Sequence, residues 1–282
     1  MKPLSLIIIV LLAFSACKQV PVGNNPAAGR YYNIRGFKMY VETYGQGRPL
    51  LFLHGNGGNM SSFTRNVPFF AKNYKVILAD SRAQGKSLDD RDSLSFEMMA
   101  DDFNVLLDSM HIKSAYVIGW SDGGINALEL AMRHPDKVAK LVATGANLWP
   151  DSTAIDPKIW LDEERDMPKY KNNAGKTAAE RQKRKMFMLD WEQPHIALAD
   201  LHKIKCPSLI MCGDHDEIRT DHTIAIAKNI PKANLWVVKN SGHGTMFEHR
   251  RIANANIGYF LSTPFDRDRK FDKSGGLFDF GY

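Results

Sequence analysis

The chain has 282 residues, of which 44% are hydrophobic and 24% charged, and its formal net charge is +6. This balance excludes a disordered chain, which would hold too few apolar residues to build a core, and the length allows one large domain or two small ones. The basic residues are scattered along the sequence. Their densest group, 181-RQKRK-185, is short and interrupted, which favours a solvated helix face over a nucleic-acid-binding surface.

The first residues have the pattern of a secretory signal. Lys2 precedes the apolar run 4-LSLIIIVLLAF-14, which is too short for a comfortable membrane span, and Ser15-Ala16-Cys17 follow it. The cysteine makes this segment resemble a bacterial lipoprotein signal, in which residues 1–16 are removed and Cys17 carries the lipid. An ordinary signal peptide is the alternative. We therefore expect a protein of the bacterial cell envelope, held at the membrane by a lipid anchor, with residues 17–30 as a flexible tether.

Beyond the tether, strand and helix patterns alternate. Residues 31–35 and 37–44 predict a β-hairpin around Gly36. Helical periodicity covers 95–110, with Ser95 as the N-cap, and also 125–133, 223–229 and 246–261. Six short apolar runs predict strands that are buried on both faces: 50-LLFL-53, 75-KVILA-79, 115-AYVIG-119, 138-VAKLVA-143, 208-SLIMC-212 and 235-LWVV-238. The alternation predicts an α/β fold over residues 31–262, with an eight-stranded, mostly parallel sheet and helices on both faces.

One segment interrupts the alternation between the sixth and seventh predicted strands. Residues 149–199 contain no clear strand and are rich in charged residues, Met, Trp and Tyr. They predict a small helical cap inserted over the sheet; a disordered insertion is the alternative, which the many side chains suited to packing disfavour. Residues 263–282 are predicted as a C-terminal tail without an assigned role. Cys206 and Cys212 flank a predicted strand, whose extended backbone holds them about 20 Å apart, too far for a disulfide.

The stretch 119-GWSDGG-124 brackets a serine between glycines directly after a predicted strand and before a predicted helix. Alone, such a stretch is also compatible with an ordinary Ser-Gly turn. In this context it predicts that Ser121 occupies a tight strand-to-helix turn at the carboxyl end of the sheet, with its hydroxyl exposed. The backbone N–H of Asp122 would then face a developing oxyanion at the helix N-terminus.

A serine nucleophile needs a base and an acid that orients the base. The chain order expected for a serine in such a turn is Ser, then Asp, then His. His243 lies between two glycines after the last predicted strand and is the natural base. Asp216, in 213-GDHDEI-218, is the natural acid, with Asp214 and Glu217 as alternatives. No Cys/His spacing predicts a metal site.

The glycine-rich stretch 54-HGNGGN-59 follows the third predicted strand and can present backbone N–H groups to a substrate. We assign the second oxyanion donor to the N–H of Asn56, with Gly57 as the alternative. His54 is expected to make structural hydrogen bonds.

Five motifs in this order, HGNGG, 80-DSRAQGKS-87, GWSDGG, GDHDE and SGHG, resemble the α/β-hydrolase fold superfamily over about residues 31–261. Within it, 119-GWSDGGINALELAMRHP-135 and 144-TGAN-147 are similar to the biphenyl hydrolase-like proteins, or valacyclovir hydrolases, which cleave esters of α-amino acids. That resemblance implies that Asp122 binds the substrate ammonium group, with Trp120 beside it as a further substrate-binding residue. A purely structural role for Asp122, stabilising a helix N-terminus, is the alternative.

Together these features predict a lipid-anchored serine hydrolase that cleaves carboxylic esters of small substrates through an acyl-enzyme, without a cofactor or metal. A serine rather than an aspartate at the turn disfavours the haloalkane dehalogenases and epoxide hydrolases of this superfamily. A C–C bond hydrolase or a cofactor-free perhydrolase with the same three residues remains an alternative. From a different class, a non-catalytic binding lipoprotein is the other alternative. The sequence does not predict the oligomeric state.

Overall fold

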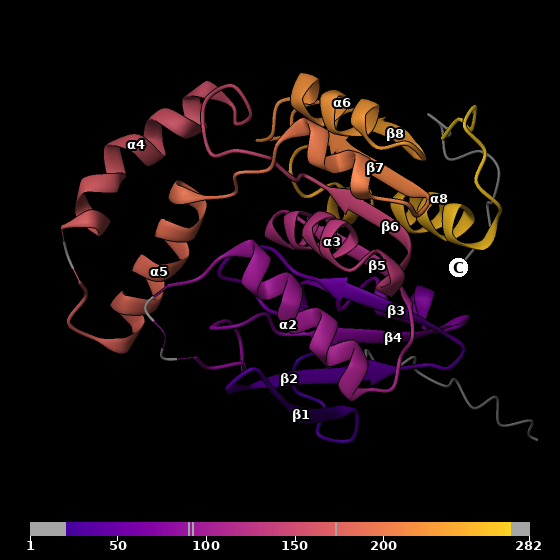
Figure 1. Ribbon diagram of the computed structural model, residues 1–282, viewed down its shortest axis with the longest axis horizontal. Helices are drawn as coiled ribbons and strands as arrows, with labels where there is room; N and C mark the ends of the chain where they lie inside the picture. Colours follow the sequence, from indigo (N-terminus) through magenta and orange to yellow (C-terminus); the bar gives the residue numbers. More distant parts are fainter. Residues whose placement is uncertain (1–20, 90, 92, 173, 272–282) are drawn as a thin grey trace, which may run out of the picture.

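The computed structural model describes residues 21–89, 91, 93–172 and 174–271, and every structural statement here concerns those residues. Eight strands form one sheet in the order β1-β2-β4-β3-β5-β6-β7-β8 (Figure 1). β2 pairs antiparallel with β1 and β4, and all other pairs are parallel, so the predicted eight-stranded, mostly parallel sheet is confirmed. The strands are β1 (Gly29–Ile34), β2 (Phe37–Tyr44), β3 (Arg48–Leu53), β4 (Tyr74–Ala79), β5 (Ala115–Trp120), β6 (Val138–Thr144), β7 (Ser208–Gly213) and β8 (Ala233–Val238).

Helices cover both faces of the sheet (Figure 1). The α-helices are α1 (Val67–Phe70), α2 (Phe96–Ser109), α3 (Asp122–Arg133), α4 (Pro157–Lys171), α5 (Ala178–Glu192), α6 (Thr220–Asn229), α7 (Thr245–Glu248) and α8 (Arg250–Ser262), with short 3-10 turns η1 (Met60–Phe63), η2 (Pro135–Lys137) and η3 (Leu198–Lys203). The predicted last helix is divided because His249 has non-helical dihedral angles, φ −109° and ψ 38°. Within the described ranges, no helix is long and apolar enough to cross a bilayer.

Alternating side chains of the strands build two separate apolar clusters, which explains why the strand sequences are apolar throughout. In β3, Leu51 and Leu53 belong to the cluster that includes side chains of α2, α3 and α6. Leu50 and Phe52 belong to the cluster that includes side chains of η1, α1 and α8. The N-cap predicted for α2 is confirmed, because Ser95 accepts a hydrogen bond from the backbone N–H of Met98.

The chain joins the domain earlier than the sequence predicts. Val22 is buried, and the backbone N–H groups of Gly23 and Asn25 donate to the carboxylate of Glu42 at 2.7 and 3.0 Å. A buried carboxylate in a strand requires donors, and this segment supplies them. The prediction of a flexible tether is therefore wrong for residues 21–30, and the domain begins near Val22. The predicted signal, residues 1–16, and the predicted lipidation site, Cys17, lie outside the described residues.

Helices α4 and α5 come between β6 and β7 along the chain. They project from the sheet as a cap (Figure 1). The two helices pack through aromatic rings. Trp160 of α4 stacks on Trp191 of α5 with ring centroids 6.0 Å apart, and Tyr170 stacks on Phe187 at 4.2 Å. The Met, Trp and Tyr content of this segment is therefore used to hold the cap helices together.

The first part of the predicted tail folds back on the sheet. Phe271 is buried and stacks on Trp236 of β8, with ring centroids 5.7 Å apart. Asn234 donates a hydrogen bond of 2.9 Å to the backbone carbonyl of Asp266. Residues 272–282 lie outside the described residues. Cys206 and Cys212 are both free and buried, in agreement with their predicted separation.

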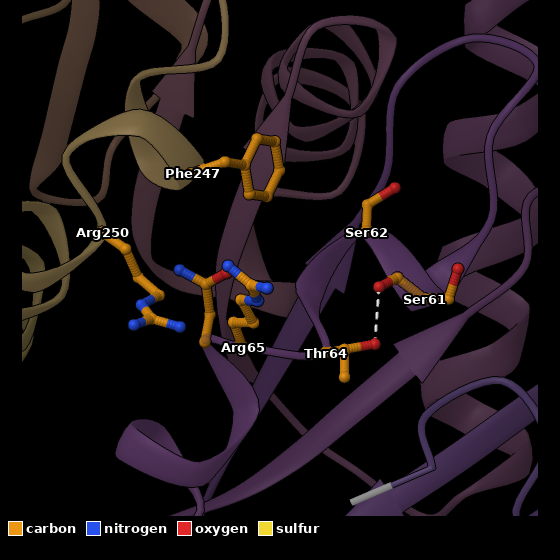
Figure 2. Close-up of a pocket in the computed structure, with 7 residues that line it drawn as sticks. Ser61, Ser62, Thr64, Arg65, Phe247 and Arg250 are labelled. Atoms are coloured by element: carbon orange, nitrogen blue, oxygen red, sulfur yellow. Dashed lines mark hydrogen bonds between the residues drawn. The ribbon is translucent and has the colours of Figure 1, made fainter. Parts of the chain in front are cut away.

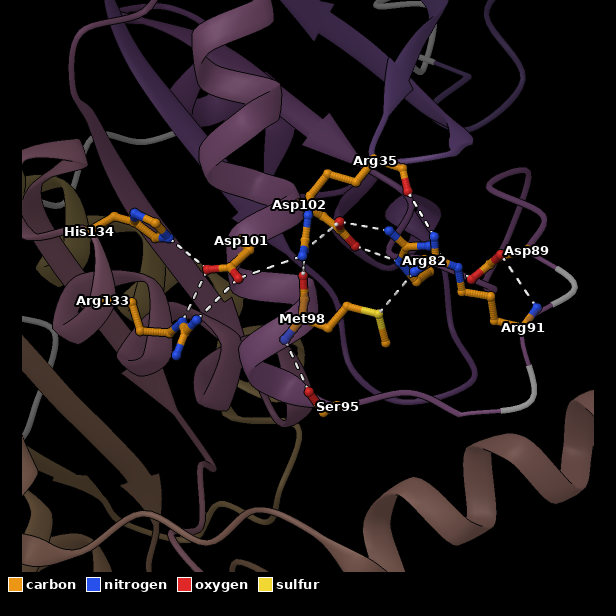
Figure 3. A network of polar contacts seen from close by, with 10 residues as sticks. All are labelled: Arg35, Arg82, Asp89, Arg91, Ser95, Met98, Asp101, Asp102, Arg133 and His134. Atoms are coloured by element: carbon orange, nitrogen blue, oxygen red, sulfur yellow. Dashed lines mark hydrogen bonds and ion pairs between the residues drawn. The ribbon is translucent and has the colours of Figure 1, made fainter.

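A buried ion pair joins the 80-DSRAQGKS-87 segment to α2 (Figure 3). The guanidinium of Arg82 donates two hydrogen bonds to Asp102, at 2.6 and 2.7 Å, and both side chains are fully buried. Arg35 donates a third at 3.2 Å, and Asp89 accepts one from Arg82 at 2.9 Å. The network fixes the loop after β4 against the helix that covers it.

Candidate active site

Ser121 occupies a sharp turn between β5 and α3. Its backbone lies in the left-handed region, with φ 57° and ψ −126°, where a residue with a Cβ is strained. A Cβ at Gly119 would lie 1.9 Å from the carbonyl oxygen of Gly123, and one at Gly123 would lie 1.9 Å from the carbonyl oxygen of Leu53. Glycine at these two positions lets β3, β5 and α3 approach closely enough to hold the turn, which is the strand–turn–helix context predicted for GWSDGG.

Three side chains from distant parts of the sequence form one chain of polar contacts. His243 Nε2 lies 2.9 Å from Ser121 Oγ, and His243 Nδ1 lies 2.6 Å from Asp216 Oδ1. Ser121 follows β5, Asp216 follows β7 and His243 follows β8. Since these strands are parallel, their carboxyl ends meet at one edge of the sheet. The structure thus brings together the three residues predicted as nucleophile, acid and base.

Of the aspartates in 213-GDHDEI-218, only Asp216 contacts His243. Its side chain is fully buried and also accepts the backbone N–H of Ile218 at 3.0 Å. Asp214 lies 2.7 Å from His215 Nδ1 and accepts the N–H of Ser241 at 3.1 Å. Asp214 thus braces the loop that carries His243, and the geometry decides between the two aspartates.

The surroundings of His243 favour its charged form over that of an ordinary histidine. Burial by itself lowers the pKa of the imidazole, but the hydrogen bond and charge of Asp216 raise it above the usual 6.5. Gly145, at φ +61°, makes room for the ring, because a Cβ there would lie 2.7 Å from His243 Cε1. This glycine belongs to 144-TGAN-147, and nothing in its spacing predicts that it lies beside the histidine.

The glycine-rich loop after β3 packs directly on the serine. A Cβ at Gly55 would lie 3.0 Å from Ser121 Cβ, so the next residue, Asn56, is near the nucleophile. Asp122 is the first residue of α3, and N–H groups of a first helical turn have no carbonyl partner within the helix. His54 has the structural role expected of it: its Nε2 accepts the N–H of Ser81 at 2.9 Å, so its Nδ1 donates to the carbonyl of Gly55 at 2.8 Å.

Trp120 packs between the loops that carry the other site residues. Its indole N–H donates to the backbone carbonyl of His243 at 2.9 Å, and its ring meets Phe247 edge to face with centroids 4.8 Å apart. It is not among the residues that line the cavity beside Ser121. Its polar group holds the histidine loop, and its role in substrate binding stays a prediction.

Asp122 meets a carboxyl group that the sequence did not connect with the site. Asn56 Nδ2 donates to Asp122 Oδ2 at 3.0 Å and to Asp190 Oδ1, on cap helix α5, at 2.9 Å. Burial raises the pKa of Asp122 to about 6, although hydrogen bonds from Asp190 and Asn56 lower it in part. Burial and the charge of Asp122 raise the pKa of Asp190 well above its usual range. The two carboxyls therefore hold a proton between them near neutral pH.

A cavity of about 70 Å³ lies beside Ser121 and His243, enclosed between the sheet edge and the cap. Its acidic lining comprises Asp122, Glu163, Asp190 and Glu217, and its apolar lining comprises Ile155, Ile159 and Ile218. Among the described residues that line it there is no lysine or arginine. The volume holds a small group beside the serine, and the cavity is open to solvent on one side.

The spacing of residues in the sequence does not predict the carboxyl side chains that line this cavity. Glu163 and Asp190 come from the two cap helices, and only the folded cap places them over the serine. Within the described ranges, no three His, Cys, Asp or Glu side chains are arranged to hold a metal ion.

Comparisons with known proteins agree with this architecture. A family model described as the alpha/beta hydrolase fold matches residues 48–193. The 2-hydroxy-6-oxo-6-phenylhexa-2,4-dienoate hydrolase of Burkholderia cepacia is 26% identical over 268 residues, covering 81% of this chain and 93% of that protein. The AB hydrolase superfamily protein YisY of Bacillus subtilis (strain 168) is 29% identical over 257 residues, covering 80% and 96%.

Among solved structures, the enol-lactonase from Burkholderia xenovorans LB400 superposes with a TM-score of 0.70 at 18% identity, covering 83% of this chain and 100% of that one. At this identity the likeness concerns the fold. Neither curated relative is named as a valacyclovir hydrolase, so the comparisons support the superfamily and not that narrower resemblance. With the model match over more than half of its length, the chain belongs to the alpha/beta hydrolase fold family.

Proposed function

We propose that the protein is a serine hydrolase that cleaves carboxylic esters of small substrates through an acyl-enzyme. The observation that carries the proposal is the unbroken chain of contacts from Ser121 Oγ through the His243 ring to Asp216, at 2.9 and 2.6 Å. A serine hydroxyl is a weak nucleophile unless a base takes its proton, and this arrangement supplies the base and fixes its orientation. The membership of the hydrolase family supports the same chemistry.

In the proposed reaction Ser121 Oγ attacks the ester carbonyl carbon while His243 Nε2 accepts the hydroxyl proton. Asp216 accepts a hydrogen bond from Nδ1–H and stabilises the imidazolium that forms. The tetrahedral adduct then expels the alcohol, which takes the proton from His243. A water molecule, deprotonated by the same nitrogen, attacks the acyl-enzyme and releases the carboxylic acid, which restores Ser121.

The oxyanion of each tetrahedral adduct needs donors that are in place beforehand. We assign these to the backbone N–H groups of Asn56 and Asp122. The close packing of the Gly55 loop on Ser121 and the position of Asp122 at the start of α3 support the assignment. Removing one such donor costs on the order of 3 kcal/mol in other serine hydrolases.

The charge of the cavity indicates which charge on a substrate it favours. Four carboxyl side chains line it, with His243 and no described lysine or arginine, so an anionic substrate would be repelled and a cationic one attracted. This supports the role that the resemblance to valacyclovir hydrolases implies for Asp122, the binding of an ammonium group of an α-amino-acid ester. Asp190 would act with it, because one amide, that of Asn56, holds both carboxyls.

Hydrolysis of a C–C bond is the second candidate function. The Burkholderia cepacia relative is named as a hydrolase of a phenylhexadienoate, and it covers most of this chain. A dienoate carries a carboxylate, however, and the acidic lining of this cavity disfavours such a group next to Ser121. The charge of the cavity therefore supports ester hydrolysis, and the name of the relative supports hydrolysis of a C–C bond.

We also propose that the protein is a lipoprotein of the bacterial cell envelope, anchored through Cys17. The support is the pattern of residues 1–17, a basic residue, an apolar run and a cysteine after small residues. Replacement of Cys17 by Ser should release the protein from the membrane fraction and abolish incorporation of radiolabelled palmitate. Unchanged labelling of the Cys17→Ser protein would contradict the anchor.

The test of the proposed function is hydrolysis by the full chain of an α-amino-acid ester and of its des-amino analogue, with Ser121→Ala as the control. Hydrolysis of both esters that depends on Ser121, faster for the amino ester, is the expected result. Serine-dependent hydrolysis without that preference would keep the esterase and remove the ammonium site. If neither ester is cleaved and a fluorophosphonate probe does not label Ser121, the proposal of a serine hydrolase is contradicted. The alternative of a non-catalytic binding protein is then favoured.

A further inference from the structure

The loop that carries His243 is bound by a carboxylate that takes no part in the proposed reaction. His243 lies between Gly242 and Gly244, directly before the short helix α7. Glu248, the last residue of α7, turns its side chain back to this loop. Its Oε2 accepts the backbone N–H of Gly242 at 2.8 Å, and its Oε1 accepts the N–H of Gly244 at 3.2 Å. One carboxylate thus holds the backbone on both sides of the histidine.

The two glycines leave room for this carboxylate. A Cβ at Gly242 would lie 3.2 Å from Glu248 Oε1, and a Cβ at Gly244 would lie 3.0 Å from the same atom. Both contacts are tighter than is usual for a Cβ, and neither glycine has a positive φ. The approach of Glu248, rather than the dihedral angles of the loop, therefore accounts for glycine on either side of the histidine.

The carbonyl group of the histidine is held from β5. The indole N–H of Trp120 donates to the carbonyl oxygen of His243 at 2.9 Å, and the indole ring meets Phe247 of α7 with centroids 4.8 Å apart. The ring of Phe247 also lines a cavity of about 400 Å³ between η1 and the start of α8 (Figure 2). Because this cavity leaves part of α7 without packing, hydrogen bonds are needed to fix the loop.

The place of the His243 ring decides the two contacts on which the proposed reaction depends. Its Nε2 lies 2.9 Å from Ser121 Oγ, and its Nδ1 lies 2.6 Å from Asp216 Oδ1. Hydrogen bonds weaken steeply with distance and angle, and a shift of about 1 Å in a reacting group can cost about 100-fold in rate. Side chains that fix the backbone of His243 therefore also fix its contacts with the nucleophile and the acid.

We propose that Glu248 and Trp120 are positioning residues that hold the His243 imidazole between Ser121 and Asp216. The inference rests on the proposed function, since it concerns the base of that reaction. Glu248 is exposed, so water screens its charge, and its effect comes from the direction of its two oxygens.

The first test compares two substitutions at Glu248. Glu248→Gln keeps the length of the side chain but leaves one glycine N–H without an acceptor, and Glu248→Ala removes both acceptors. We expect kcat of ester hydrolysis to fall by about tenfold in the first variant and by about 100-fold in the second, because the chemical step needs the aligned base. The KM should stay within about twofold, since substrate binding is unaffected. Glu164→Gln, at an exposed position on α4, is the matched control and should equal the wild type.

The same assay is applied to Trp120→Phe, which removes the indole N–H and keeps an aromatic ring against Phe247. We expect a lower kcat at an unchanged KM here as well. Both Glu248 variants lose the same charge, so an equal loss of kcat in the two would indicate a charge effect and contradict positioning. A graded loss, larger in Glu248→Ala, supports the proposal. Thermal melting verifies that each variant is folded, and Glu248→Gln decides if Glu248→Ala is not.

The second test needs no substrate. NMR titration of the full chain with isotope-labelled histidine measures the pKa of His243, whose signal is identified by its loss in His243→Gln. The charges that face this ring are those of Asp216, Glu217 and Asp122, and the hydrogen bond and charge of Asp216 raise the pKa most. A ring that moves away from Asp216 loses part of this effect. The pKa should therefore fall in Glu248→Ala, fall less in Glu248→Gln and stay unchanged in the control.

The two tests separate this inference from the proposed function. If the wild type cleaves no ester, the proposed function fails, and the titration alone decides whether Glu248 positions the ring. A wild-type pKa of His243 together with a wild-type kcat in Glu248→Ala overturns the role of Glu248. The same result in Trp120→Phe overturns the role of Trp120.

Discussion

Two buried aspartate sites in this molecule are neutralised in different ways. Asp102 receives hydrogen bonds from two arginines, Arg82 and Arg35 (Figure 3). Asp122 is nearly as buried, yet its partners are an amide, that of Asn56, and a second carboxyl, that of Asp190. The first site carries permanent charges of opposite sign, whereas the second must hold a proton.

The difference shows which site can recognise a ligand. An aspartate that already meets a fixed guanidinium has little to gain from a further cation. A carboxyl pair that holds a proton can exchange it for a cationic group, and this one faces the cavity beside Ser121. We therefore expect the Arg82–Asp102 pair to act on stability alone, and the Asp122–Asp190 pair to act on substrate preference at little gain in stability.

The largest effect is expected from the nucleophile itself. Ser121→Ala should lower kcat for ester hydrolysis by about 10⁴- to 10⁶-fold, because the attacking oxygen is lost. The melting temperature should change little, since alanine removes one partly buried hydroxyl and keeps the same backbone conformation. Ser109→Ala, on the outer side of α2, is the control and should keep full activity. Appreciable turnover in the purified Ser121→Ala protein would place the chemistry elsewhere.

The contribution of the Arg82–Asp102 pair to stability is tested by replacing Asp102. Asp102→Ala leaves the buried Arg82 guanidinium without its main partner, which should reduce the free energy of unfolding by about 3–5 kcal/mol. Asp162→Ala breaks an exposed pair with Arg165 and should cost less than about 1 kcal/mol. Urea denaturation measures both. Where the Asp102→Ala protein is folded, its preference between the amino ester and the des-amino ester should equal that of the wild type.

The role of the Asp122–Asp190 pair in substrate recognition is tested by replacing Asp190, on the cap helix α5. Asp190→Asn removes a carboxyl that can lose its proton to accommodate a cation, at nearly constant shape, and should reduce the preference for the amino ester over the des-amino ester by about tenfold, or about 1.4 kcal/mol. The kcat/KM of the des-amino ester should change little. Asp162→Asn, on the exposed side of the cap helix α4, serves as the control. An unaltered preference in Asp190→Asn would mean that the cap carboxyl takes no part in binding.

The smallest effect concerns pH and stability. The pKa of Asp122 is raised from 3.8 to about 6 in the folded chain, so the protonated pair stabilises the fold fully below about pH 4 and that stabilisation is lost as the pH rises through 6. Asp190→Asn removes one titrating group. Because burial and the charge of Asp122 raise the pKa of Asp190 well above its usual range, the wild type should lose more stability than the variant as the pH rises from 4 to 7, and the difference between their melting temperatures should grow over this range. A difference that is constant over this range would contradict the shared proton.

The three candidate catalytic residues were predictable because each is tied to the local pattern of one strand end. Ser121 lies between glycines that the close approach of β3, β5 and α3 requires, and His243 follows the last strand. Asp216 and Asp214 could not be separated by sequence, because two positions along one loop decide which carboxylate reaches the imidazole. The hydrogen bond from Trp120 to the loop of His243 could not be predicted, because nearness in sequence to the serine does not set the direction of its indole.

The sequence by itself determined the alternation of strands and helices, the strand-to-helix turn at Ser121 and the order of the three catalytic residues. These follow from apolar periodicity and glycine placement, which act over a few neighbouring residues. Only the tertiary structure joined Asp190 and Glu163 to Asp122 and brought Gly145 against His243. Such pairs are separated by tens to hundreds of residues, so their charges meet only when the cap and the helices pack on the sheet.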